Sequence, residues 1–289
     1  MDVSSFEYRD LKISFLSKDE ITCPLCETVL QREEIHSGGG RLIAGKLTDE
    51  LHRLYEPSAK YGNVYPLVYP VTVCPDCWFA AMDKDFINMP PKIKNQLASD
   101  KAQRIRDVEQ IFPPVDFSRP RTLMEGVVSQ YLALKCYDFF PKESSPSIKQ
   151  AITALRGGWL FDELHKTYPD QNFDWLAVLF KQKAEFLYNE SIQREQEGKE
   201  ALSAIKNLGP DTDKNYGYEG VLYLSGLLRY KYGSREDTGR RLELLRESKR
   251  TIAKMFGLGR SSKSKPGPLL ENARNLYEKL NKELNETDE

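Results

Sequence analysis

Two Cys-Pro-x-Cys segments constrain the fold of this chain more than any other feature. They are Cys23-Pro24-Leu25-Cys26 and Cys74-Pro75-Asp76-Cys77. A two-residue spacer lets a tight turn direct both sulfurs at one ion, and two such pairs complete a tetrahedral site. The sequence therefore predicts one metal centre whose ligands are Cys23, Cys26, Cys74 and Cys77, and a fold that brings two distant segments together.

Four thiolates would fill every coordination position, so no bound water would remain for activation, and the ion is expected to be structural rather than catalytic. We expect one structural Zn²⁺, because zinc is the commoner occupant of paired knuckles, although iron also suits four thiolates. Thiol redox chemistry is a weaker alternative. A redox C-x-x-C normally opens a helix within a strand-helix-strand unit, and the sequence shows no such alternation.

The remaining cysteine and the histidines give no catalytic constellation. Cys136 lies on an apolar helical face, where a free cysteine behaves as a small hydrophobe. His36 and His52 lie between the ligand pairs and are interpreted as exposed loop residues, and His165 as a helix-terminal or surface residue. The sequence contains no G-x-x-x-x-G-K-[ST], H-E-x-x-H or G-x-S-x-G motif. We therefore predict no catalytic or cofactor-binding residues and a protein that is not an enzyme.

Charge and hydropathy exclude several classes of protein. The 42 Lys and Arg residues are balanced by 43 Asp and Glu residues, so the net charge of -1 gives no long-range attraction to nucleic acid or anionic lipid. No stretch approaches the length of a membrane-spanning helix, and Met1–Leu11 lacks the apolar core of a secretory signal. A cytoplasmic location is predicted, in which the cysteines are metal ligands or buried thiols rather than disulfides.

The segment around the ligand pairs predicts little regular structure. Glu27–Leu30 favours a short return strand because it contains β-branched residues. Thr48–Leu54 is expected to form a short helix. Asn63–Val73 should be an irregular edge strand that leads to Cys74, because its two prolines cannot donate ladder hydrogen bonds.

Farther along, the pattern becomes helical. A charged, partly exposed helix is expected at 92–110, and from about residue 122 apolar residues such as Leu123, Val127 and Tyr131 recur at steps of three and four. This spacing predicts about seven helices joined by short loops. The first begins near residue 122, and the others are expected at roughly 147–166, 173–194, 198–207, 217–232, 237–255 and 268–285.

The predicted fold is mainly α: a small zinc-ribbon-like N-terminal module followed by a helical domain. Antiparallel pairs of this length favour a tetratricopeptide-like stack, although an ordinary helical bundle explains the irregular spacing equally well. We predict three regions: a zinc-ribbon-like module with an insertion at 1–87, a connecting helix and linker at 88–121, and the helical tetratricopeptide-like domain at 122–289.

Several segments resemble one bacterial family. Cys23–Cys26, Tyr65–Tyr69 and Val73–Ala81 are similar to the domain-of-unknown-function family 2225, and Leu155–Leu160 is similar to a family helix that carries an Ala-Trp-Leu segment. The resemblance spans about residues 15–255. It implies a zinc-ribbon-type part, a tetratricopeptide-like part and the same four cysteine ligands, but no established reaction. The chain departs from the family pattern at Trp78, where glycine is expected, and at Gly158, where alanine is expected.

These observations favour a zinc-binding, non-catalytic cytoplasmic scaffold or adaptor that binds a protein or peptide through its helical domain and does not enter a membrane. Stacked helices present extended surfaces, and tyrosine is enriched in interfaces. The candidate anchors are Tyr216, Tyr218, Tyr223, Tyr230 and Tyr232.

Two other functions stay open. The first is nucleic-acid binding through the metal module, for which basic residues between the ligand pairs would supply the charge, although nearby acidic residues weaken it. These residues are Arg32, Arg41, Lys46 and Arg53. The second is a metalloenzyme, which would require one of the four cysteines not to be a ligand, or a thiol-redox protein that uses either cysteine pair.

Overall fold

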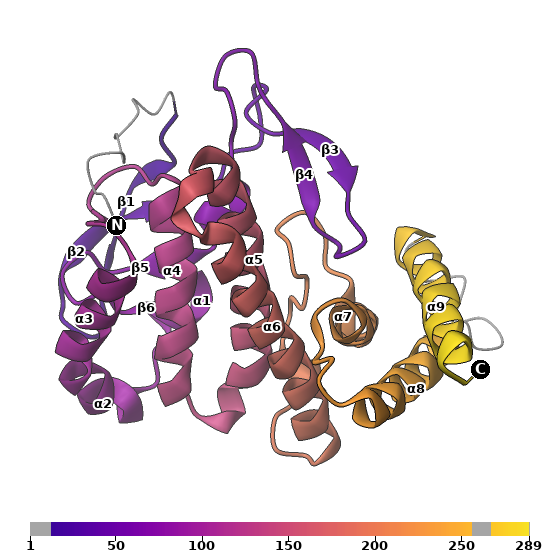
Figure 1. Cartoon of the computed structure of the whole chain (residues 1–289). Helices are drawn as coiled ribbons and strands as arrows, with labels where there is room; N and C mark the ends of the chain where they lie inside the picture. The colour runs from indigo at the N-terminus through magenta and orange to yellow at the C-terminus, as the bar shows by residue number, and fades with distance from the viewer. Residues whose placement is uncertain (1–12, 256–266, 289) are drawn as a thin grey trace.

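The computed structural model describes residues 13–255 and 267–288. The chain forms a small β-rich part that leads into a row of helices (Figure 1). This arrangement confirms the predicted mainly α fold with a small N-terminal module. In the described ranges, each helix is either too short or too polar to cross a bilayer.

The β-rich part consists of three antiparallel hairpins, each a separate two-stranded sheet. The six strands are β1 (Leu16–Thr22), β2 (Val29–Glu33), β3 (Ile43–Leu47), β4 (Arg53–Glu56), β5 (Val71–Val73) and β6 (Ala80–Met82). In the first hairpin Thr22 pairs with Val29, and in the third Val73 pairs with Ala80. The tips of these two hairpins are the two Cys-Pro-x-Cys segments, as a zinc ribbon requires.

Helices make up most of the remaining described chain. Three helices follow the third hairpin: α1 (Asp83–Ile87), α2 (Lys94–Ser99) and α3 (Lys101–Ile111). The longer ones are α4 (Leu123–Cys136), α5 (Pro146–Thr167), α6 (Phe173–Gln196), α7 (Gly217–Tyr232), α8 (Thr238–Met255) and α9 (Gly267–Asp288).

From α4 to α9 each helix packs against the next one, and α7 also contacts α9. The closest pair is α5 and α6, where two glycines remove the side chains that would separate the helices. A Cβ atom on Gly157 would lie 2.6 Å from the ring of Phe180, and one on Gly158 would lie 2.8 Å from Lys181. Small residues in the Leu155–Leu160 segment are therefore needed for this helix pair.

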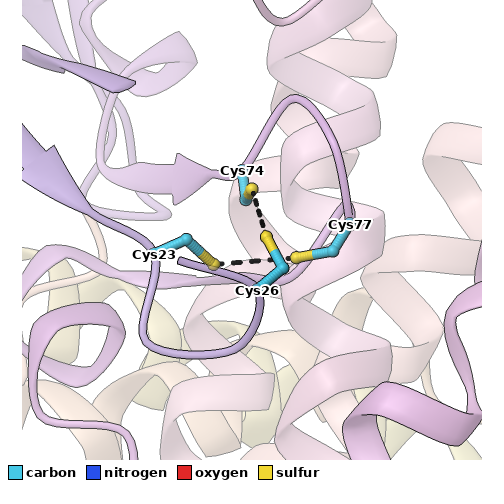
Figure 2. Close-up of side chains that lie close together, drawn as sticks. All are labelled: Cys23, Cys26, Cys74 and Cys77. Atoms are coloured by element: carbon cyan, nitrogen blue, oxygen red, sulfur yellow. Dashed lines mark hydrogen bonds between the residues drawn. The ribbon is translucent and has the colours of Figure 1, made fainter. Parts of the chain in front are cut away.

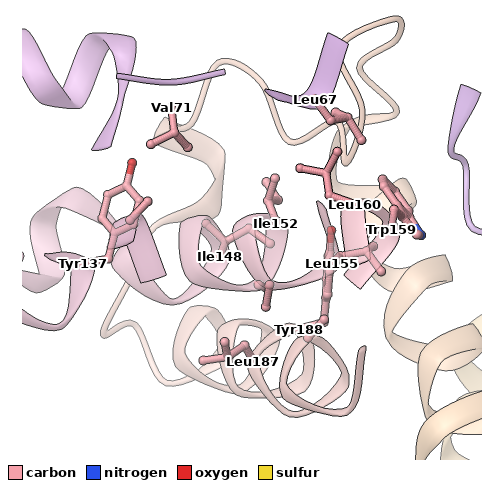
Figure 3. Packing of buried hydrophobic residues seen from close by; sticks show 14 of the residues in the cluster. Leu67, Val71, Tyr137, Ile148, Ile152, Leu155, Trp159, Leu160, Leu187 and Tyr188 are labelled. Atoms are coloured by element: carbon pink, nitrogen blue, oxygen red, sulfur yellow. The ribbon is translucent and has the colours of Figure 1, made fainter. Parts of the chain in front are cut away.

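The hydrophobic core runs without a break from the β-rich part into the helices. Figure 3 shows α5 in the middle of this core, with Leu67 and Val71 on one side and Leu187 and Tyr188 of α6 on the other. All of these side chains are buried. The hairpin that carries the second cysteine pair is thus anchored in the same core as the helical row.

Two predicted helices are wrong. Thr48–Leu54 is instead a tight turn and the start of β4, because the Thr48 amide donates to the His52 carbonyl and closes the β3–β4 hairpin. The segment 198–207 contains one short 3₁₀ turn, Leu202–Ala204, because Gly198 adopts a left-handed conformation just after α6. Met1–Leu11, which is predicted to lack a secretory signal, lies outside the described residues.

Candidate metal centre

The first cysteine pair lies in the turn between β1 and β2. The Cys23 amide donates to the Thr28 carbonyl over 2.9 Å, and the Glu27 amide donates to the Cys23 carbonyl over 2.9 Å. These bonds fold the turn so that both sulfurs are on its inner side. Glu27 adopts a φ of 66°, in the left-handed region that favours glycine.

The second pair repeats this turn between β5 and β6. The Cys74 amide donates to the Phe79 carbonyl, and the Trp78 amide donates to the Cys74 carbonyl, each over 2.9 Å. Trp78 has a φ of 56°, so it matches Glu27. The residue after the second cysteine of each knuckle is left-handed, which explains why glycine is expected there. This chain adopts the turn with other residues.

The two hairpins bring the four predicted ligands together (Figure 2). All four Sγ atoms lie within 4.8 Å of one another. The Cys23 and Cys77 sulfurs are 3.7 Å apart, and those of Cys26 and Cys74 are 3.5 Å apart. A tetrahedral ion with metal–sulfur bonds of about 2.3 Å needs sulfur–sulfur distances of about 3.8 Å. The four cysteines are therefore positioned to hold one metal ion.

The short distances between the thiols also change their pKa values. Hydrogen bonds from the neighbouring thiols of Cys23 and Cys77 lower the pKa of Cys74. Hydrogen bonds with Cys23 and Cys74 raise the pKa of Cys77, and the hydrogen bond with Cys74, together with burial, raises the pKa of Cys23. Without a cation the cluster thus favours one shared negative charge, because several thiolates at these distances repel each other. A divalent cation would replace the remaining protons.

A buried arginine braces the second knuckle. Arg104 of α3 is fully buried and donates to the carbonyl oxygens of Cys77 over 2.8 Å and Trp78 over 3.1 Å. Its guanidinium also pairs with Asp100 over 2.8 Å. The sequence gives no signal for this role, because Arg104 lies in a charged helix that reads as partly exposed.

A second buried arginine joins the two hairpins. Arg121 pairs with Glu33 of β2 at 2.5 Å and donates to the carbonyl of Val71 in β5 over 2.8 Å. Nearby lysines make more exposed contacts with the knuckle turns: Lys101 with Asp76 at 3.0 Å and Lys94 with Glu27 at 3.7 Å. Each of these cations is matched by an acid, so the contacts tie the knuckles to the surrounding chain without adding net positive charge.

The other sequence candidates lie elsewhere. Cys136 is fully buried in α4, which confirms core packing, and burial raises its pKa to about 11. His36 is exposed, as expected, and His165 is in the last turn of α5. The exposed position predicted for His52 is wrong, because its side chain is only 16% exposed and bonds Asp211.

The candidate tyrosine anchors are mostly unsuitable for binding a partner. Tyr216 and Tyr223 are buried, and Tyr230 and Tyr232 are half-buried. Only Tyr218 among the five is exposed, at 37%. Helical periodicity alone cannot distinguish a core tyrosine from an interface tyrosine.

Comparison with known proteins finds a relative that aligns with nearly the whole chain. An uncharacterized protein of Borreliella burgdorferi is 42% identical over 274 residues, which cover 94% of this chain and 98% of that protein. No solved structure matches the chain. The model of the family described as "Uncharacterized protein conserved in bacteria (DUF2225)" matches residues 16–280, a range that contains all four cysteines. The chain therefore belongs to the DUF2225 family of bacterial proteins.

Proposed function

We propose that this protein is a non-catalytic scaffold in which one structural zinc ion fixes the N-terminal hairpins and the helical row binds a helical segment of another protein. The site supports a structural ion because four cysteine sulfurs converge and would complete its coordination. The proposal puts the protein in the cytoplasm, where cysteines remain reduced. It also treats the helical row, residues 122–289, as the tetratricopeptide-like part and 1–87 as the metal module.

The observation that carries the binding role is an apolar stripe on α6. It consists of four exposed residues on one face of the helix: Trp175, Val178, Leu179 and Phe186. Trp175 is 62% exposed and Phe186 is 55% exposed. Large aromatic side chains are rarely left in water in such a row unless they contact something else.

The length and spacing of this stripe favour an amphipathic helix as the partner. Residues 175–186 cover about 16 Å of helix axis at 1.5 Å per residue, or three turns. An apolar face of the same length on a second helix would cover it, as in helix-in-groove recognition. Lys183, whose Nζ lies 5.5 Å from the Phe186 ring centre, and Asp174 supply charge beside the stripe.

Nucleic-acid binding has less support. Two of the four basic residues considered for it are paired with acids: Arg32 with Asp83 at 2.8 Å and Arg53 with Asp213 at 3.0 Å. Their charge is thus largely neutralised at the surface.

The zinc part of the proposal is tested by metal analysis of the purified full-length protein and of a Cys74→Ser, Cys77→Ser variant. We expect one zinc per chain in the wild type and none in the variant, together with a lower melting temperature. A wild type that carries iron would overturn the choice of zinc. The structural role of the ion would be overturned if the purified wild type contained no metal and its melting temperature did not change when a chelator was added.

The binding role is tested with a photo-crosslinking residue at Val178, and at the exposed Glu109 of α3 as a matched control, in cells of the source bacterium. We expect a crosslink at Val178, and not at Glu109, whose peptide maps to an amphipathic helix of one protein. Trp175→Ala with Phe186→Ala should abolish it without changing the melting temperature. Equal crosslinking at both positions, or an unchanged crosslink in the double variant, would overturn the role of α6.

A further inference from the structure

His52, a residue with no part in the metal site, is held in one orientation from two sides. Its Nδ1 lies 2.5 Å from Oδ2 of Asp211, whose side chain is completely buried. Its ring lies flat against the indole of Trp159, with the ring centres 4.3 Å apart and the planes within 8°. The two partners come from distant parts of the chain, so the tertiary fold alone places this ring.

The buried carboxylate fixes the tautomer of the histidine. Burial alone would raise the pKa of Asp211, but hydrogen bonds from His52 and from the amides of Arg53 and Thr212 outweigh it and hold that pKa below its usual value. Because a carboxylate only accepts hydrogen bonds, Nδ1 of His52 must be the donor. When the ring is neutral, its acceptor is therefore Nε2.

His52 forms part of the wall of a pocket of about 320 Å³, at the small end of the range for ligand sites. The wall is built from 52–57 in and after β4, from 63–67 before β5, and from the C-terminal half of α5. Figure 3 shows two of the α5 wall residues, Trp159 and Leu160, at the outer end of the core beside Leu67. The pocket therefore lies where the β3–β4 hairpin meets the helical row.

The charges around the pocket balance. Arg53 is bound to Asp213 over 3.0 Å and to the carbonyl of Gly45 over 2.9 Å. Lys166 is bound to Glu163 over 2.6 Å. With both cations engaged by acids, the lining offers little attraction to a phosphate or carboxylate, and a neutral ligand is favoured.

The polar atoms of the lining select the chemistry of that ligand. The lining includes the acceptors of His52, Glu56 and Glu163, of which Glu163 also holds Lys166. Aromatic and aliphatic groups supply much of its wall, including Trp159, Tyr65 and Leu67. A ligand that matches both the acceptors and the apolar wall needs a flat apolar ring and at least two N–H donors. Amino-substituted heteroaromatic bases have this combination, and the volume suits a base or nucleoside rather than a larger molecule.

We propose that the pocket between β4 and α5 binds a neutral, amino-bearing heteroaromatic compound of the nucleobase type, with His52 Nε2 as a hydrogen-bond acceptor oriented by Asp211. This site is separate from the cysteine cluster and from the α6 stripe. Its function does not depend on either.

The test uses the full-length protein labelled with ¹⁵N-histidine, because the chain has only three histidines and their ring nitrogens can be assigned one by one. Adenosine, guanosine and cytidine are titrated to millimolar concentration. Uridine, which has no amino group, and adenosine monophosphate, which is charged, are the comparison ligands. We expect Nδ1 of His52 to be protonated in the free protein, and at least one amino-bearing nucleoside to shift its Nε2 signal but not those of His36 and His165.

Two variants, made at residues that are equally exposed in the wild type, distinguish binding in the pocket from binding elsewhere. Leu54 lines the pocket, Leu179 lies on α6, and each is 37% exposed. Leu54→Trp should remove the shift at an unchanged melting temperature, whereas Leu179→Trp should keep it. The proposal is overturned if no amino-bearing nucleoside shifts Nε2, if the shift survives in Leu54→Trp, or if uridine or adenosine monophosphate binds as tightly.

Discussion

The guanidinium of Arg104 donates a hydrogen bond of 2.8 Å to the carbonyl oxygen of Cys77, a candidate metal ligand 27 positions earlier in the chain. This contact joins α3 to the second knuckle in a fully buried environment. Metal ligands are commonly oriented by such surrounding hydrogen bonds. The stability of the metal centre should therefore depend on a helix that contributes none of its ligands.

Replacing Arg104 tests this dependence. Arg104→Met leaves Asp100 and two knuckle carbonyls without their donor, so the free energy of unfolding should fall by about 3 kcal/mol. Metal affinity, measured by chelator competition, should fall about tenfold. Arg106→Met, at an exposed position of the same helix, should change stability by less than about 0.5 kcal/mol. Equal effects of the two variants would contradict the bracing role.

The left-handed residue of the first knuckle gives a stabilising substitution. Glu27 is exposed with a φ of 66°, and glycine adopts this conformation without steric cost. Glu27→Gly should raise the free energy of unfolding by about 0.5 to 1 kcal/mol, measured by urea denaturation. Glu20→Gly, at an exposed position within β1, should instead lower it by a similar amount. A loss of stability in Glu27→Gly would show that the turn is not strained.

A buried acid makes the attachment of the β3–β4 hairpin sensitive to pH. Glu50 accepts hydrogen bonds from Trp159 over 2.6 Å, Tyr232 over 2.6 Å and Lys231 over 2.9 Å. Burial alone would raise the pKa of Glu50, but Lys231 and these hydrogen bonds together hold it below its usual value. Its contribution to stability is thus present above the unfolded-state pKa of about 4.3 and is lost as the pH falls through the lower folded-state value.

Glu50→Gln measures that contribution, because the amide keeps the shape of the side chain but not the charge. At pH 7 the variant should be less stable than the wild type by about 2 kcal/mol. The difference should shrink as the pH falls below about 4, where the wild-type carboxylate becomes protonated. Thermal unfolding of both proteins from pH 7 to pH 3 provides the measurement. A gap that stays constant over this range would argue against an ionised Glu50.

The fifth cysteine provides a variant that distinguishes the loss of core packing from the loss of a metal ligand. Cys136 is completely buried in α4 and is not one of the four clustered cysteines. Cys136→Ala should keep the full metal content while lowering the free energy of unfolding by about 1 kcal/mol through a small cavity. Cys74→Ser is the comparison, since it should lose metal as well as stability. Loss of metal from Cys136→Ala would mean that the ligand set has been assigned wrongly.

The sequence by itself determined the four cysteines of the candidate site and most of the long helices. Both signals are local: a two-residue spacer fixes the turn around Cys23 and Cys26, and apolar residues at steps of three and four fix the face of a helix such as α4. The same local reasoning failed at Thr48–Leu54 and at 198–207. There, pairing with β3 and a left-handed Gly198 decided the conformation.

Only the tertiary structure decided which polar residues surround these elements. Arg104 lies in a helix that looks exposed in sequence, yet it is buried because two knuckle carbonyls need a donor at that point. His52 and Asp211 are 159 residues apart and meet only because the β3–β4 hairpin packs on α5 and α7. Hydrogen bonds between such distant groups leave no periodic pattern in a sequence, whereas the turn and helix signals depend on neighbours that are already close along the chain.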